Sequence, residues 1–209
     1  MKAEVVIPGC ARPLVDAHVP IAMTIDGVLT PDECAQLMTK IDDQGPAVAP
    51  ISTAYGFVMN DDIRNNERAI FDDHALAARL FASLEPVLPK RMVHEMLGGP
   101  ARMVPVGANE RFRCYRYRPG QYFKPHYDGR FERNDAERSL LTLMVYLNDD
   151  FTGGGTRFLE FGVEVAPRAG MALVFQHPVL HEGCTVERGA KYVLRSDVMY
   201  RRLAADAIA

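Results

Sequence analysis

A histidine and an aspartate stand two residues apart in the segment FKPHYDGRF, residues 123–131. Side chains alternate along a strand with a period of two, so His126 and Asp128 point to the same side. Both side chains bind divalent metals, but a His-x-Asp pair is common by chance. A functional metal site also requires a third ligand and a scaffold that holds the ligands together.

Two candidates for the third ligand follow in HPVLHEGC, namely His177 and His181. His177 comes after an apolar run and before Pro178, which disfavours a helical site built from both histidines. Spacing alone leaves both histidines open as the third ligand. Two histidines and one carboxylate leave one face of a metal open, which is the usual arrangement for non-haem Fe(II) in oxygenases. A structural zinc site normally has four ligands, mostly Cys and His.

The segment KYVLRSDVMY has the pattern of a strand with two cations on one face. Lys191, Val193 and Arg195 share that face. Either the face points to solvent, or it points into the fold, where a buried cation requires an anion such as the carboxylate of a small dicarboxylic acid. The pattern by itself leaves both alternatives open.

These residues need elements to position them, and the chain changes character near residue 110. From there on, short runs rich in aromatic and β-branched residues alternate with turn sequences, which indicates a β-sandwich or barrel. Before it, VPIAMTIDGV predicts a short strand. A helix should follow, with Thr30 as N-cap, Pro31 at the first position and Glu33 completing a capping box. A second helix is predicted in DDHALAARLFASLE, capped by Asp72 or Asp73.

Composition narrows the class of protein. The chain has 209 residues, 48% of them hydrophobic, and a net charge of -3. It therefore suits one domain and does not favour nucleic-acid binding through bulk electrostatics. No segment approaches the roughly 20 apolar residues of a membrane span or the core of a signal peptide. The cysteines are scattered without a CxxC pair, which favours reduced thiols in a cytoplasmic protein. The oligomeric state is not readable.

Five ordered blocks of the sequence resemble the prolyl-4-hydroxylase-like branch of the Fe(II)/2-oxoglutarate dioxygenases. They are GVLTPDECAQLM, YRPGQYFKPHYDG, LTLMVYLNDDFTGGGTRF, APRAGMALVF and HEGCTVERGAKYVLRSDVMY. The resemblance implies a mainly β fold with N-terminal helices, a double-stranded β-helix or jelly roll. Residues 1–209 would form a single domain, with helical support over about 1–100 and a catalytic core over about 110–202. One departure is Gly155, where many relatives have Glu.

The same resemblance implies roles for individual residues. His126, Asp128 and His181 would bind Fe(II), which gives His177 a structural role. Lys191 would bind the distal carboxylate of 2-oxoglutarate. Further cosubstrate contacts are expected from Tyr115, Tyr146 and Arg195, although Arg195 is alternatively a substrate anchor. The implied activity is hydroxylation of an unactivated C–H bond with O2, with release of succinate and CO2 and with ascorbate in support.

The substrate stays open between an amino acid, a small metabolite and a peptidyl residue, and the compact chain slightly favours a small one. The polar segment from Tyr55 to Ile70 is interpreted mostly as loop. We hypothesise that it is a mobile lid, with Arg64, Asn66 and Arg68 binding substrate; the alternative is a solvated loop. A non-catalytic jelly-roll module that binds a metal or a small acid is the alternative function, although no ligand is lost. A zinc hydrolase would leave Lys191 without a role.

Overall fold

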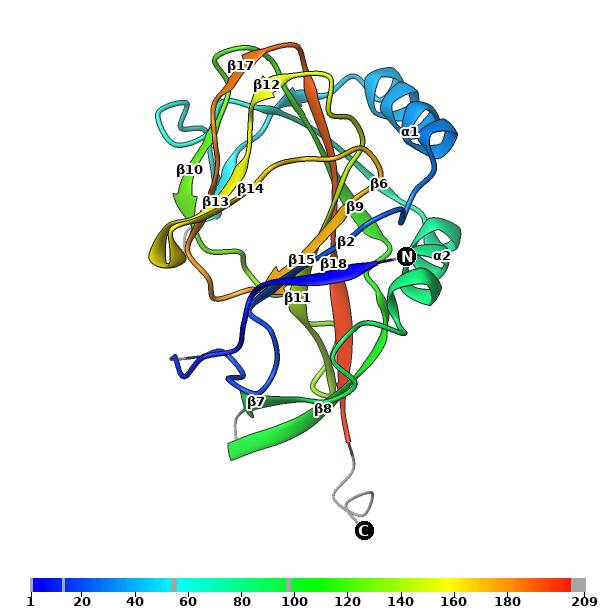
Figure 1. Ribbon diagram of the computed structural model, residues 1–209, viewed down its shortest axis with the longest axis vertical. Helices are drawn as coiled ribbons and strands as arrows, with labels where there is room; N and C mark the ends of the chain where they lie inside the picture. Colours follow the sequence, from blue (N-terminus) through cyan, green and yellow to red (C-terminus); the bar gives the residue numbers. More distant parts are fainter. Residues whose placement is uncertain (1, 13, 54–55, 97–98, 204–209) are drawn as a thin grey trace.

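Two antiparallel sheets form a barrel that is open at one end. The computed structural model describes residues 2–12, 14–53, 56–96 and 99–203 (Figure 1). Eight strands of the larger sheet form a continuous path, in the spatial order β1 (Ala3–Ile7), β2 (Ala22–Ile25), β15 (Ala172–Gln176), β11 (Glu137–Tyr146), β18 (Lys191–Arg202), β9 (Arg111–Tyr117), β6 (Glu67–Asp72) and β3 (Ala47–Val48). The hairpin of β7 (Met92–Met96) and β8 (Gly99–Ala108) joins it through β18.

The smaller sheet closes the barrel. It has the order β10 (Phe123–His126), β16 (His181–Gly183), β13 (Thr156–Phe158) and β14 (Val163–Val165). Two short ladders complete the rim: β12 (Thr152–Gly153) with β17 (Val186–Arg188), and β4 (Ile51–Thr53) with β5 (Gly56–Val58). A 3-10 turn, Leu159–Phe161, links β13 and β14. This arrangement is the predicted mainly β jelly roll with N-terminal helices.

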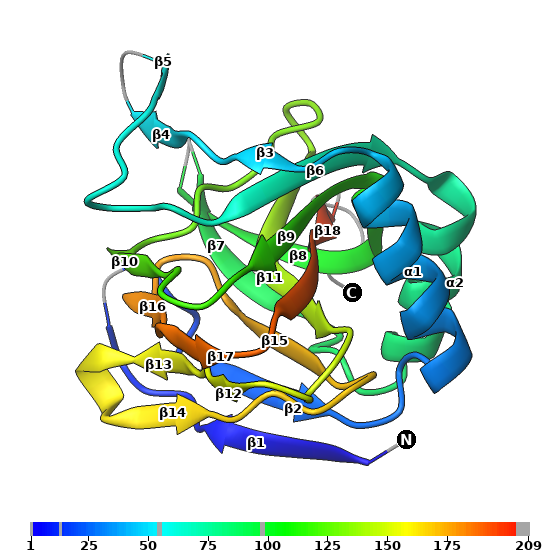
Figure 2. The same ribbon diagram turned by 90° about the horizontal axis from the view of Figure 1, so that it is seen from above.

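Both predicted helices form, and their caps are those expected from the sequence. Helix α1 spans Pro31–Asp43, and the capping box between Thr30 and Glu33 is complete. Helix α2 spans His74–Leu84, and Asp73 is its N-cap because its carboxylate accepts the backbone N–H of Leu76 at 3.0 Å. The two helices lie next to each other on the flank of the barrel opposite β10 (Figure 2).

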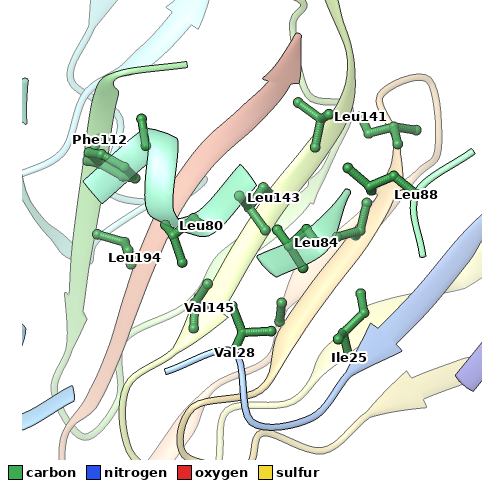
Figure 3. Close-up of a cluster of buried hydrophobic side chains, with 14 of the residues drawn as sticks. Ile25, Val28, Leu80, Leu84, Leu88, Phe112, Leu141, Leu143, Val145 and Leu194 are labelled. Carbon is green, nitrogen blue, oxygen red and sulfur yellow. The ribbon is translucent and has the colours of Figure 1, made fainter. Parts of the chain in front are cut away.

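Strand β18 separates two cores because its side chains alternate. Its Leu194 faces the helices and packs with Leu80 and Leu84 of α2, whereas its Val193 packs inside the barrel. Figure 3 shows the helix-side cluster, in which Leu80 and Leu84 point toward Leu143 and Leu194. The helices therefore hold the outer face of the larger sheet, and the inner face is left for the site.

Two expectations need correction. Residues 1–100 are not only a helical support, because β1 and β2 extend the larger sheet and β3 to β7 also lie in this range. The segment from Tyr55 to Ile70 is loop over residues 59–66, apart from an isolated bridge at Arg64, and strand on either side. Residues 56–58 form β5, and Glu67–Asp72 is a full strand paired with β9. Tyr55 lies outside the described residues.

Candidate functional site

Three of the predicted residues meet where the two sheets open. His126 ends β10 and His181 begins β16, and the antiparallel register places them directly opposite each other. Asp128 follows two residues after His126, so its carboxylate lies 3.9 Å from His126 Nε2 and 3.8 Å from His181 Nε2. One donor atom from each residue lies within 4.8 Å of the others. Among the described residues this is the one cluster of three or more such donors close enough to hold a metal ion.

Both histidines are oriented by the backbone. His126 Nδ1 lies 2.8 Å from the carbonyl oxygen of Lys124, and His181 Nδ1 lies 2.9 Å from that of Val179. A carbonyl only accepts, so each Nδ1 carries the proton and each Nε2 lone pair is left for a metal. Burial lowers the pKa of His126 to about 3, which keeps its ring neutral. Phe123 stacks on His126 with the ring centroids 3.5 Å apart and fixes the ring plane.

The carboxylate of Asp128 is held ionised and in place. Its burial favours the neutral acid, but the charge of Arg195 holds the pKa of Asp128 well below its usual range. Arg195 Nη2 lies 3.3 Å from Asp128 Oδ2, and Thr142 donates its hydroxyl to the same oxygen at 2.7 Å. The set of two imidazoles and one carboxylate therefore fits Fe(II), with the opposite face left for other ligands.

His177 lies outside the triad and supports it through a hydrogen-bonded chain. Thr142 has one hydroxyl proton, which goes to Asp128, so Thr142 Oγ1 must accept from His177 Nδ1–H at 2.9 Å. His177 Nε2 must then accept from the Ser139 hydroxyl at 2.7 Å. Burial lowers the pKa of His177 to about 4, consistent with this neutral tautomer. Both ring nitrogens are occupied, so His177 has no lone pair left for a metal.

Lys191 is a buried cation that has no acidic partner among the described residues. Its ammonium group donates to the Gly154 carbonyl at 2.6 Å and lies over the rings of Tyr117 and Tyr146. No carboxylate of the described residues lies within ion-pair distance of it. Burial lowers its pKa to about 8. The inward orientation of this face of β18, one of two alternatives from the sequence, is therefore the correct one.

One narrow cavity connects Lys191 with the triad. Lys191, His126, Asp128 and His181 all line it, together with Tyr115 and Arg195. A buried ammonium that lacks an anion, in the same cavity as a three-donor metal site, fits a dicarboxylic acid that also reaches the metal.

The two tyrosines expected near the cosubstrate differ in position. Tyr115 lines the cavity, whereas Tyr146 is fully buried behind it and shares a hydrogen bond of 2.7 Å with Thr156. Tyr117 lines the cavity and was missed from the sequence, although its place two residues after Tyr115 on one strand face would have indicated it.

Gly155 is shielded by a carboxylate from another strand. Arg157 and Glu164 are opposite each other in the register of β13 and β14, and they form an ion pair at 3.0 Å. The Glu164 side chain occupies the space that a Cβ at position 155 would need. A side chain at this position is therefore incompatible with the present place of Glu164.

A wider groove, about 630 Å³, opens from the triad to the surface. Arg64 and Arg68 line it, but Asn66 does not and is fully buried. Arg64 is also buried, with its guanidinium between the rings of Tyr115 and Phe123 and its Nε bonded to Asn66 Oδ1 at 2.7 Å. The hypothesis of a mobile lid that carries Arg64 and Asn66 is therefore wrong, because Arg64 is a packed part of the groove wall and Asn66 is buried outside the lining of the groove.

Comparison with known proteins identifies the class. Residues 112–196 match the family model of the 2OG-Fe(II) oxygenase superfamily. The chain is 25% identical to prolyl 4-hydroxylase 1 of Arabidopsis thaliana over 91% of its own length and 72% of that protein. The viral collagen prolyl hydroxylase of Paramecium Bursaria Chlorella virus-1, solved with 2OG, covers 87% of this chain and 96% of its own, with a TM-score of 0.56 and 21% identity.

A prolyl hydroxylase of Trichoplax adhaerens, solved with a peptide fragment of hypoxia inducible factor, has a TM-score of 0.57 and 16% identity. It covers 85% of this chain and 83% of its own. The matched segment, residues 112–196, is thus that of a 2OG-Fe(II) oxygenase. The protein is a prolyl-4-hydroxylase-like, 2-oxoglutarate-dependent hydroxylase that uses Fe(II), 2-oxoglutarate and O2. No helix among the described residues is long and apolar enough to cross a membrane.

Proposed function

We propose that the chain hydroxylates a prolyl residue within a peptide or protein segment, and that His126, Asp128 and His181 hold the Fe(II). In this proposal Lys191 binds the distal carboxylate of 2-oxoglutarate. The observation that carries the assignment is the buried, anion-free ammonium of Lys191 in the same cavity as the three metal donors. When bound, iron with 2-oxoglutarate and O2 supplies the oxidising power for hydroxylation, with succinate and CO2 as the other products.

In this proposal the residues of the chain bind the cosubstrate, orient the metal ligands and exclude water. Lys191 fixes one end of the cosubstrate, because an ammonium in a dry cavity is strongly stabilised by a carboxylate. Thr142 and Arg195 hold one oxygen of Asp128, which leaves the other oxygen, Oδ1, for the metal. Phe123 and Tyr117 wall the cavity and keep water from the site. Arg195 is assigned to Asp128 in preference to 2-oxoglutarate or substrate.

Two observations support a peptidyl substrate in preference to a small metabolite. The groove is open to the surface at the triad, so a segment of chain can cross it without burying its ends. Phe57, in the middle of β5, and Tyr127, between two of the metal donors, are exposed and line the groove. Figure 2 shows β4 and β5 projecting beyond the rest of the rim on this side. The two relatives named as prolyl hydroxylases of proteins or peptides have this fold.

The experiment supplies Fe(II), ascorbate and 2-oxoglutarate, and compares proline-containing peptides with free proline. Succinate release and a mass gain of one oxygen on the peptide are measured, and 4-hydroxyproline is identified after hydrolysis. The Asp128→Ala variant is the inactive control and His74→Ala, at the exposed start of α2, is the active one. Hydroxylation of free proline with no product from any peptide would contradict the peptidyl substrate.

A further inference from the structure

The groove above the triad is unusually rich in arginine. Its walls contain Arg64, Arg68, Arg111, Arg113, Arg130 and Arg195, while Asp128 is the one acidic residue among those that line it in the described part of the chain. Asp128 is one of the three metal donors and so does not neutralise the substrate groove. The surface that a substrate meets is therefore strongly cationic, although the whole chain has a net charge of -3.

The strand register explains how the cluster arises. β9 pairs with β6 on one side and with β18 on the other, so Arg113 lies directly opposite both Ile70 and Arg195. Arg68 lies opposite Tyr115, two positions along. Side chains at alternate positions share a face, so Arg68, Arg111 and Arg113 all lie on the inner face of the sheet that bears Arg195. Like charges directly opposite each other in a sheet are destabilising.

Three of these arginines have ion pairs with described residues: Arg113 with Asp197, Arg130 with Glu132, and Arg195 with Asp128 and Asp197. The charges of the other three are poorly neutralised by the described part of the protein. Arg68 has no ion pair or hydrogen bond to another described side chain, and its burial together with Arg64 and Arg113 lowers its pKa. The Arg111 guanidinium comes no closer than 4.0 Å to Asp72, and both side chains are more than half exposed. Arg113 Nη1 and Arg64 Nη2 are buried from solvent, and neither has a hydrogen-bond partner among the described residues, although Arg113 Nη1 lies 3.6 Å from Asp197 Oδ2. A buried donor without an acceptor requires an explanation, and a bound ligand, ion or water that accepts from it is one.

We propose that the groove binds an acidic segment, with an aspartate or glutamate side chain of the substrate paired to Arg68, Arg111 and Arg113. The planar guanidinium presents paired donors that match a carboxylate, which a lysine does not. Arg113 lies 3.6 Å from Asp197, and Asp197 lies 3.2 Å from Arg195, which contacts Asp128. Arg113 is therefore linked to the metal donor Asp128 through Asp197 and Arg195.

At about 3.3–3.6 Å per residue of extended chain, the acidic residue falls within roughly three positions of the hydroxylated one. The identity of the target as proline rests on the proposed function, but binding of the acidic side chain does not. The two claims are therefore tested with one set of four peptides. They share a neutral host sequence and combine Glu or Gln near the centre with Pro or Ala at the target position.

Binding is measured by fluorescence anisotropy with Mn(II) and 2-oxoglutarate present, and hydroxylation is measured with Fe(II). We expect both Glu peptides to bind roughly tenfold more tightly than the Gln peptides, as for a charge-assisted pair. This preference should weaken as salt is raised, because the groove is open to solvent. The register of Glu relative to Pro is scanned over three positions on each side.

Variants assign the preference to the arginines. In Arg68→Gln and Arg111→Gln the ratio of Glu to Gln affinity should fall toward one. Arg168→Gln, which removes an exposed arginine paired with Asp26 outside the groove, should keep the ratio of the parent. Arg111 is more than half exposed, so its variant keeps the test valid if Arg68→Gln fails to fold. The 2-oxoglutarate requirement is measured for each variant, which separates substrate binding from cosubstrate binding.

The outcomes are distinct. Equal binding of Glu and Gln peptides would overturn the inference and leave the prolyl assignment standing if the Pro peptides are hydroxylated. Preferential binding of Glu peptides without hydroxylation of Pro would overturn the prolyl assignment and uphold the acidic site. A Glu preference that persists in both arginine variants would also overturn the inference, because another surface would then be responsible.

Discussion

Replacing Lys191 with methionine should stabilise the protein without cosubstrate and abolish its response to 2-oxoglutarate. The side chain is fully buried and its ammonium has a carbonyl partner but no carboxylate among the described residues. Burial lowers its pKa from 10.5 to about 8. At about 1.4 kcal/mol per pKa unit, keeping this group charged in the fold costs on the order of 3 kcal/mol.

Methionine removes that charge and has a similar length. It also loses the hydrogen bond to the Gly154 carbonyl, which offsets roughly 1–2 kcal/mol of the gain. We therefore expect the Lys191→Met protein to be about 1–2 kcal/mol more stable than the parent at pH 7. For a chain of this length that corresponds to a rise in Tm of roughly 3–6 °C.

The effect has a defined pH dependence. Below pH 8, Lys191 is charged in both the folded and the unfolded chain, so the parent carries the full cost of burial. Between pH 8 and pH 10.5 the unfolded chain binds more protons than the folded one, so the stability of the parent rises with pH. The difference between Lys191→Met and the parent should therefore shrink across this range.

Thermal unfolding with Mn(II) in place of iron measures both effects. Saturating 2-oxoglutarate should stabilise the folded parent by linkage, with a gain in the free energy of unfolding of about 2.7 kcal/mol at 100 times Kd. The Tm of the parent should therefore rise, and the Tm of Lys191→Met should stay unchanged. Lys90→Met, which alters an exposed lysine, is the matched control. A Lys191→Met protein that is less stable at pH 7, or that responds to 2-oxoglutarate like the parent, would refute the reasoning. If the Tm of Lys191→Met still rose with 2-oxoglutarate, Arg195 would be the residue that binds the distal carboxylate.

Two further predictions concern the supports of the site. Thr142→Val keeps the shape of the side chain but removes the hydrogen bonds to Asp128 and His177, so we expect Fe(II) to bind roughly tenfold more weakly in equilibrium dialysis. The Tm should also fall modestly, because the buried His177 Nδ1–H loses its acceptor. Equal iron affinity would contradict a role for the bond to Asp128. Arg64→Ala should lower the free energy of unfolding in urea by about 2–4 kcal/mol, because it removes two ring contacts and leaves Asn66 without its partner. If Arg64→Ala kept full stability and only uncoupled succinate formation from hydroxylation, the lid hypothesis would be restored.

Sequence patterns predicted correctly those features that depend on residues close together in the chain. The capping box at Thr30 and the N-cap Asp73 depend on residues three positions apart, and both form as expected. The shared face of Lys191 and Arg195 follows from strand periodicity alone. Its direction does not, because which face points inward depends on the helices packed against Leu194 on the other face.

The misread segments have a common physical cause. β6 reads as loop because half of its sequence, ERAIFD, is charged and the segment before it is polar, yet its Arg68 faces the groove and its Ala69 packs against the helices. A strand that lines a polar site carries polar residues on the face where a core strand carries hydrophobic ones. Its sequence therefore lacks the hydrophobic alternation by which strands are predicted. The chain of Ser139, His177 and Thr142 was equally hidden, because its members are brought together by tertiary packing and no spacing indicates it.

Stoichiometric binding of Fe(II) under anaerobic conditions tests the central claim most directly. By equilibrium dialysis, we expect one Fe(II) per chain for the parent and for His74→Ala. The variants His126→Ala, Asp128→Ala and His181→Ala should each lose it while keeping their fold. The decisive comparison is between the two histidines near Pro178. If His181→Ala retained one Fe(II) per chain and His177→Ala lost it, the triad described here would be wrong.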